Sequence, residues 1–99
     1  MRKLTALLLV LAFVYIGVPR NLAAKQYIIA TATTGGTYYP VGVAIATLTS
    51  IKLRKKGITA NAISSAGSGE NVDMLKNKEV DFAILQGLFG AMAYNGKMK

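Results

Sequence analysis

A pattern of strand, turn and helix recurs three times along this chain, and it restricts the possible folds more than any other feature. Each unit begins with a short run that is apolar or alternating, and the three runs are Gln26–Ala32, Ile58–Ile63 and Val80–Gln86. Each run leads into a turn and then into a segment with helical spacing of apolar residues. These helical segments are expected from the Thr37–Tyr39 region to Gly57, from Gly69 to Asn77, and from Leu88 to Tyr94.

The order β-α-β-α-β-α predicts parallel strands joined by right-handed crossovers. We therefore expect an α/β fold with three layers, in which a mostly parallel sheet of strand order 2-1-3 carries crossover helices on both faces. In such sheets ligands bind beyond the carboxyl ends of the strands, where the winding direction reverses. The turns after the three strands are expected to meet at that edge.

The periodicity also predicts which side chains form the core. The first helix carries apolar residues at i, i+3, i+4 and i+7, which predicts a single core-facing stripe. The second helix should face inward through Val72 and Leu75, with Ser68 as its cap and Glu70 in its first turn. The third strand is expected to bury Phe82 to Leu85. The predicted stripe of the first helix consists of Val41, Ala44, Ile45, Leu48 and Ile51.

The stretch Ala30–Pro40, ATATTGGTYYP, contains the first of the three turns. Gly35 and Gly36 allow a ligand to approach the main chain closely. The helix that follows, with Thr37 as a possible cap and Pro40 best placed at its first helical position with Tyr39 outside, points unpaired N–H groups and a positive dipole end at the turn. Such a place suits a carboxylate or another small anion. The alternative is a tight turn that binds nothing.

The second and third turns supply similar groups. The segment Ser64–Ser68 is small and rich in hydroxyls, and Gln86 ends the third strand among apolar neighbours. A buried amide needs partners, so Gln86 either contacts a ligand or bridges to the first turn. Of the two tyrosines, Tyr38 and Tyr39, one is expected in the core and the other beside a pocket.

Several functional classes are excluded or disfavoured by the residue inventory. The Gly-Gly turn is followed by no Lys-Ser or Lys-Thr pair and is not a G-x-G-x-x-G motif, so neither a P-loop nor a dinucleotide site is indicated. The chain has no Cys and no His, and its four acids lie between Glu70 and Asp81. We therefore expect no enzyme activity, no metal and no cofactor.

The N-terminal segment, residues 1–24, has the form of a secretory signal peptide. Arg2 and Lys3 precede an apolar run from Leu4 to Val18, and small residues follow at Ala23 and Ala24. Cleavage would leave residues 25–99 as the folded domain in a periplasmic or other extracytoplasmic compartment, where the lack of cysteine favours the periplasm. The alternative is an uncleaved N-terminal anchor.

A basic cluster lies where the first helix should end. It contains Lys52, Arg54, Lys55 and Lys56. Cations at a helix C-terminus complement the helix dipole, and no aromatic residues interleave with them as nucleic-acid stacking requires. Nucleic acid is therefore not expected as a partner. A different reading is a small basic protein that is anchored by Leu4–Val18 and attracted to anionic lipid.

The run Thr34–Gly42, TGGTYYPVG, resembles the N-terminal signature of TAXI-type solute-binding proteins, the periplasmic receptors of one class of TRAP transporters. The resemblance continues in register through Ala66–Asn71, Glu79–Phe82, Gln86 and Ala93–Gly96. Each motif alone is weak, but the ordered set is specific and, with the export signal, covers essentially the whole chain.

The resemblance implies a two-lobed periplasmic binding protein of the type II fold, of which this chain matches part of one lobe. It also implies capture of a small organic acid or amino acid, often glutamate-like, for TRAP membrane subunits. Two departures from the family pattern are Ala32-Thr33 in place of a second Gly pair and Gly87-Leu88 in place of Ser-Asp. The ligand-binding positions implied by motif match are Thr34, Gly35, Gly36, Thr37, Tyr38, Ser65, Gly67, Ser68 and Gln86.

Without a second lobe to close over the ligand, the chain by itself is expected to bind such acids weakly or not at all. A third reading is a non-functional remnant of a truncated gene, which shares all of these sequence features.

Overall fold

The computed structural model describes residues 24–98. Apart from Ala24, the predicted signal peptide lies outside the described residues. Within them, no helix is both long enough and apolar enough to cross a membrane. The elements in chain order are β1 (Lys25–Ala30), α2 (Tyr38–Leu53), the 3-10 helix η1 (Arg54–Lys56), β2 (Ile58–Ile63), α3 (Ser68–Lys76), β3 (Phe82–Ala83) and α4 (Gly87–Tyr94).

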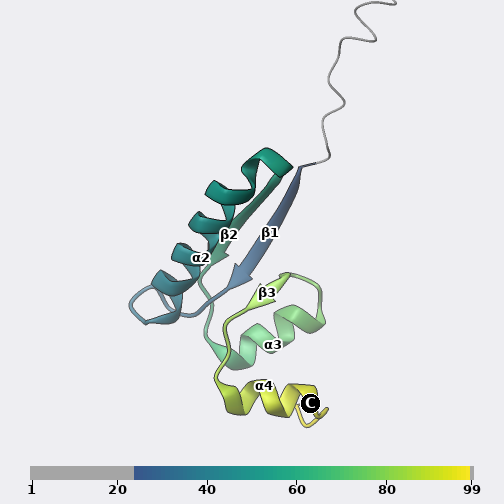
Figure 1. Ribbon diagram of the computed structural model, residues 1–99. Helices are drawn as coiled ribbons and strands as arrows, with labels where there is room; N and C mark the ends of the chain where they lie inside the picture. Colours follow the sequence, from purple (N-terminus) through teal and green to yellow (C-terminus); the bar gives the residue numbers. More distant parts are fainter. Residues whose placement is uncertain (1–23, 99) are drawn as a thin grey trace, which may run out of the picture.

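The three strands form one parallel sheet in the order β2-β1-β3 (Figure 1). β1 pairs with β2 along its whole length, from Lys25 opposite Ile58 to Ala30 opposite Ile63. β3 pairs with β1 over two positions only. The predicted α/β fold with strand order 2-1-3 is confirmed.

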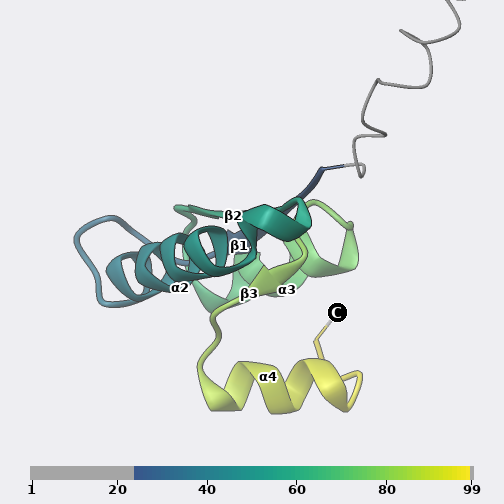
Figure 2. The ribbon, with the colours of Figure 1, turned by 45° about the horizontal axis from the view of Figure 1, so that its top comes forward.

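The helices lie on both sides of these strands. α2 packs along β2 and β1, whereas α3 lies against β3 on the other side, with α4 beside α3 (Figures 1 and 2). The described helices therefore make a layer on each side of the sheet, as the right-handed crossovers require.

The face of α2 that meets the sheet differs from the predicted one. Gly42 and Ala46 are its buried residues, and they lie about a third of a turn away from the centre of the predicted stripe. That stripe is largely in solvent, with exposed fractions of 45% for Val41, 47% for Ile45, 58% for Leu48 and 65% for Ile51.

Small side chains explain this orientation of α2. A β-carbon on Gly42 would lie 2.3 Å from the Cγ2 atom of Thr31, so only glycine allows the helix to approach so closely. About two turns further along α2, the Ser50 hydroxyl accepts a hydrogen bond from the Ala60 N–H (2.9 Å) and donates one to the Ala60 carbonyl oxygen (3.1 Å). α2 is apolar around most of its circumference, so its periodicity could not reveal which face packs on the sheet.

β3 is shorter and more exposed than the predicted strand Val80–Gln86. Only Phe82 and Ala83 form the strand, although the Ile84 N–H still bonds to the Ala30 carbonyl (2.9 Å). Phe82 was predicted to be buried, but 56% of it is exposed. As an edge strand, β3 has a pairing partner on one side only, so the chain is free to turn away towards α4.

The predicted helix boundaries hold to within two residues, except that α2 ends at Leu53 and the 3-10 helix η1 continues to Lys56, and the predicted cap of α3 is wrong. Thr37 occupies the predicted N-cap position of α2 without a side-chain hydrogen bond, and because helix geometry already begins at Tyr38, Pro40 is the third helical residue rather than the first. Gly67, rather than Ser68, is the N-cap of α3. Gly57 adopts the predicted left-handed conformation (φ 75°) after η1.

Candidate functional site

The turns that follow β1, β2 and β3 lie at the same end of the sheet (Figure 1). The first two are joined directly, because the Ser65 N–H donates to the Ala32 carbonyl (3.1 Å) and the Thr31 N–H donates to the Ile63 carbonyl (3.0 Å). The Thr31 hydroxyl, on a residue with no exposed surface, donates to the same Ile63 oxygen (2.6 Å). The roots of these turns are therefore fixed to one another by backbone and side-chain bonds.

Asn71 of α3 is the centre of this arrangement. Its side chain is fully buried, and its Nδ2 atom donates to the carbonyl oxygens of Thr31 (2.6 Å) and Ile84 (2.9 Å). One amide thus links the segment after β1 to the segment after β3. A buried amide that lost these partners would leave unsatisfied polar groups, so the three turns are held in place by a polar network.

Ser65 completes the network on the β2 side. Its hydroxyl lies 2.6 Å from Asn71 Oδ1 and 3.2 Å from the Thr31 oxygen. Because both hydrogens of the Asn71 amide point at carbonyls, Oδ1 is left as an acceptor, and the Ser65 hydroxyl donates its proton there. The same hydroxyl accepts a hydrogen bond from the Gly67 N–H (3.1 Å).

Ser68 ties the second turn to the third. Its buried hydroxyl accepts a hydrogen bond from the Gln86 N–H (2.9 Å). The Gln86 side chain, predicted to be a buried amide, is exposed, because the chain leaves the sheet after Ala83 and Gln86 becomes the N-cap of α4. Gln86 therefore contributes to the turn through its backbone, and its amide faces solvent.

The first turn is the open part of the site. Residues 33–37 are exposed, and the Gly36 N–H donates to the Thr33 carbonyl (3.0 Å). α2 has no acidic residue in its first turn and no side-chain cap. At the start of this helix, the Val41 N–H donates a hydrogen bond to the carbonyl oxygen of Thr37, the N-cap residue. The N–H groups of Tyr38 and Tyr39, both half-buried residues, are thus left for an external acceptor.

The start of α3, by contrast, already has a negatively charged side chain beside it. The Glu70 carboxylate accepts a hydrogen bond from the Ala66 N–H, and its negative charge stands in the first turn of the helix, as predicted. Gly67 has φ 121° and ψ −159°, a conformation that is essentially restricted to glycine. The start of α2, unlike that of α3, has no acidic side chain in its first turn.

The structure joins some of the predicted site residues by hydrogen bonds and leaves others without such bonds to the rest. Ser65 and Gly67 belong to one hydrogen-bonded network with Asn71, whereas Ser68 and Gln86 are joined to each other by a separate hydrogen bond. The tip of the first turn lies at the same end of the sheet but joins the network only through its root at Thr31 and Ala32. The residues of this tip that were predicted as ligand-binding are Thr34, Gly35, Gly36, Thr37 and Tyr38.

Sequence reasoning missed Thr31 and Asn71 as site residues. A signal for Asn71 was present, since Ser68, Asn71, Val72 and Leu75 share one helix face at i, i+3, i+4 and i+7. Val72 on that face is buried. A polar residue on a core-facing stripe must find hydrogen-bond partners inside the protein, and in a sheet of this topology the nearest partners are the ends of the strands.

A model of a known protein family matches the part of the chain that forms this edge of the sheet. The model of the NMT1-like family matches residues 29–99, a range that contains all three turns. The chain belongs to the NMT1-like family. This family is related to the periplasmic binding proteins, and membership implies a small-molecule ligand and indicates an extracytoplasmic location.

The chemistry of the three turns fits a binding site in an NMT1-like protein. They offer N–H groups, hydroxyls and the exposed Gln86 amide, and the Glu70 carboxylate lies beside the second turn. Among residues 24–98 no group of three potential metal-ligating side chains comes together. These groups can hold a small polar ligand by hydrogen bonds.

Proposed function

We propose that this chain is the extracytoplasmic solute-binding component of a TRAP-type secondary transporter of the TAXI class. In this proposal it captures a small carboxylate or amino acid, such as glutamate, and presents it to the membrane subunits. The proposal assigns the chain a binding function and no catalytic one.

The observation that carries the proposal is the uncapped start of α2 beside the hydrogen-bonded turns. α2 has 16 residues and no acidic residue or side-chain cap at its N-terminus, whereas Glu70 already caps the turn before α3. A ligand carboxylate would accept hydrogen bonds from the N–H groups of Tyr38 and Tyr39, where the helix dipole favours negative charge. Hydroxyls of the second turn and the Gln86 amide would orient the rest of the ligand.

A second lobe would complete the site in this proposal. In two-lobed binding proteins, hinge closure buries the ligand between the lobes. The exposed turn at residues 33–37 offers only one wall of such a site. We therefore expect the 99-residue chain to bind organic acids in the millimolar range or more weakly.

Ligand-detected NMR tests this proposal, because saturation transfer detects weak binding. We expect transfer from the full chain to glutamate and none to 1,5-diaminopentane, which carries two positive charges. Gly35→Asp should abolish transfer, since a carboxylate would then compete at the helix start. A β-carbon at Gly35 would meet nothing within 4 Å, so this variant should fold.

Asn61→Asp is the matched control. It adds the same charge at an exposed position of β2, away from the turns, and should leave the transfer to glutamate intact. Equal transfer to glutamate from the wild type and Gly35→Asp would contradict the proposed site.

Cell fractionation tests the proposed location. A mature protein in the periplasmic fraction whose N-terminus lies near Lys25 would support the receptor. A membrane-bound product that begins at Met1 or Arg2 would instead favour the basic, membrane-anchored alternative.

A further inference from the structure

Five cations gather at the end of the sheet that is opposite to the three turns. β1 and β2 are parallel and begin at this end, and α2 runs back to it, so the topology collects residues from three elements here (Figure 1). The five residues are all exposed, and we call the surface that they form the basic end. They are Lys25 of β1, Lys52 in the last turn of α2, and Arg54, Lys55 and Lys56 of η1.

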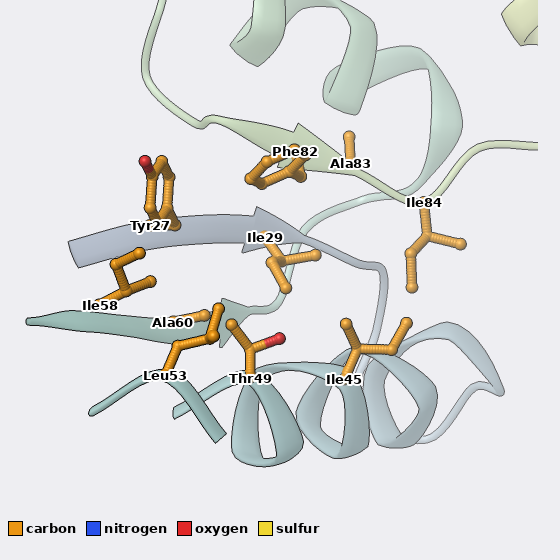
Figure 3. A pocket seen from close by; sticks show the side chains of 10 residues that line it. All are labelled: Tyr27, Ile29, Ile45, Thr49, Leu53, Ile58, Ala60, Phe82, Ala83 and Ile84. Carbon is orange, nitrogen blue, oxygen red and sulfur yellow. The ribbon is translucent and has the colours of Figure 1, made fainter. Parts of the chain in front are cut away.

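Backbone hydrogen bonds hold the elements of the basic end together. The Lys25 N–H donates to the Gly57 carbonyl (2.8 Å), and the Gly57 N–H donates to the Arg54 carbonyl (2.9 Å). Gly57 is left-handed (φ 75°), which ends η1 and turns the chain into β2 beside the start of β1. Leu53, the residue before Arg54, and Ile58 lie at this same end of the sheet in Figure 3. The basic end is therefore a fixed part of the fold.

The charges of the chain are segregated along its sequence. Residues 25–57 contain these five cations and no acid, whereas residues 58–98 contain four acids and three cations, which nearly cancel. The acid that the structure places on β1 is Asp81, whose carboxylate accepts a hydrogen bond from the Ile28 N–H (2.8 Å), three residues along the strand from Lys25. None of the elements that form the basic end carries an acid of its own.

The helix dipole explains only part of this cluster. Cations in the last turn of a helix complement its dipole, but the effect falls off within that turn. Lys25 belongs to a strand, and Lys55 and Lys56 lie beyond the last turn of α2. Cations that are held close together repel one another, and an anionic partner at the basic end would offset that repulsion.

The basic end lies too far from the turns to attract the proposed solute. β1 is six residues long, so the two ends of the sheet are about 20 Å apart, more than two Debye lengths at physiological ionic strength. Further protein is also a poor cover for this surface, because burying cations that have no acidic partner carries a large desolvation cost. The basic end is therefore an outer surface, and its charge fits an anionic partner.

We propose that the basic end docks on the anionic surface of a phospholipid membrane. Exposed lysines and arginines are attracted to the phosphates of anionic lipids, and η1 contains no apolar residue that would insert into the bilayer. The apolar run Leu4–Val18 precedes β1 at this same end, and the intervening residues 19–24 span at most about 20 Å. A membrane contact of that run would thus bring the basic end to the lipid surface.

This contact is peripheral and sensitive to salt, which distinguishes it from an N-terminal anchor. It leaves the three turns at the far end of the sheet, facing the aqueous compartment. The inference does not rest on the proposed solute site, because the basic end would bind lipid whether or not the turns bind an organic acid.

Cosedimentation of the exported chain, as purified from cells, with lipid vesicles tests the inference. The quantity measured is the preference for equimolar phosphatidylglycerol and phosphatidylcholine over phosphatidylcholine alone. Each cation near an anionic surface contributes about 5-fold, so the preference should be on the order of 1,000-fold at low salt. Lys52→Gln, Lys55→Gln and Lys56→Gln together should reduce it about 100-fold, and about 0.5 M NaCl should abolish it.

A second triple variant separates the place of the charge from its amount. Lys76→Gln, Lys78→Gln and Lys97→Gln remove the same charge from exposed positions outside the basic end, and this variant should keep the preference to within about 5-fold. An equal loss in both triple variants would overturn the inference, because net charge alone would then account for the binding. Binding to polyglutamate without any preference for the anionic vesicles would also overturn it and would indicate an acidic protein as the partner.

Amide NMR signals in the presence of anionic vesicles doped with a spin-labelled lipid locate the contact. The amides of Lys25 and of residues 54–57 should broaden, and those of Gly35 and Gly36 should keep their line widths. Broadening at the two glycines without broadening at residues 54–57 would place the opposite end on the membrane and contradict the inference. Because glutamate binding at the turns is measured separately, failure here would leave the solute site unaffected.

Discussion

Asn71 Nδ2 lies 2.6 Å from the carbonyl oxygen of Thr31, and both residues are fully buried. This hydrogen bond connects the first helical turn of α3 to the segment that follows the central strand. The same amide reaches the Ile84 carbonyl after β3, so one side chain holds two of the three turns in register. The proposed solute site therefore depends on a residue that need not touch the ligand.

Replacing Asn71 should destabilise the protein strongly. Asn71→Leu keeps a similar size but leaves the carbonyls of Thr31 and Ile84 without their donor, and we expect a loss of about 3 kcal/mol in the free energy of unfolding. Urea denaturation followed by circular dichroism measures it. Asn95→Ala is the control, because Asn95 also donates to a carbonyl (Ala91, 2.7 Å) but in an exposed position, and it should cost under about 0.5 kcal/mol.

Gly42 and Gly90 should respond to alanine in opposite directions. A β-carbon at Gly42 would lie 2.3 Å from Thr31 Cγ2, so Gly42→Ala should force α2 off the sheet and cost about 2 kcal/mol. At Gly90, inside α4, a β-carbon would meet nothing within 4 Å, and alanine should stabilise by about 0.5–1 kcal/mol. Thermal unfolding of both variants provides the comparison, and equal effects would contradict the packing of α2.

The orientation of α2 predicts which apolar residues matter for stability. Leu48→Gln should change the free energy of unfolding by no more than about 0.5 kcal/mol, because 58% of Leu48 is exposed. Val72→Ala should cost about 2 kcal/mol, because only 4% of Val72 is exposed. If Leu48→Gln proved the more damaging of the two, the helix face predicted from periodicity would be the correct one.

Ser50 should stabilise β2 and slow hydrogen exchange at one of its amides. Its hydroxyl bonds to both the N–H and the carbonyl of Ala60, so Ser50→Ala should cost about 1–2 kcal/mol and accelerate hydrogen exchange at the Ala60 amide. Thr47→Ala, at an exposed position of the same helix, should leave that exchange rate unchanged. Unaltered exchange in Ser50→Ala would show that the side chain does not hold the strand.

The strand order and most boundaries followed from local patterns. The alternation in Ile58–Ile63 predicted β2 with its observed ends, and Gly57 marked the stop before it. These features depend on neighbouring residues along the chain, which is why sequence reasoning could find them.

The face of α2 and the Asn71 network depend on residues far apart in the chain. Gly42 faces the sheet because Thr31 stands opposite it, and periodicity does not record that contact. Likewise, the partners of Asn71 are 40 and 13 residues away. The meeting of the three turns at one end of the sheet was predicted, whereas the side chain that holds the turns together became apparent only from the tertiary structure.

The most direct test of the central claim is a titration of the isotope-labelled chain with glutamate, followed by amide chemical shifts. If the three turns form one ligand-binding edge, the amides of Gly35, Gly36, Gly67 and Gln86 should shift together with a single midpoint in the millimolar range. Shifts confined to one turn, or different midpoints for the three turns, would contradict the account.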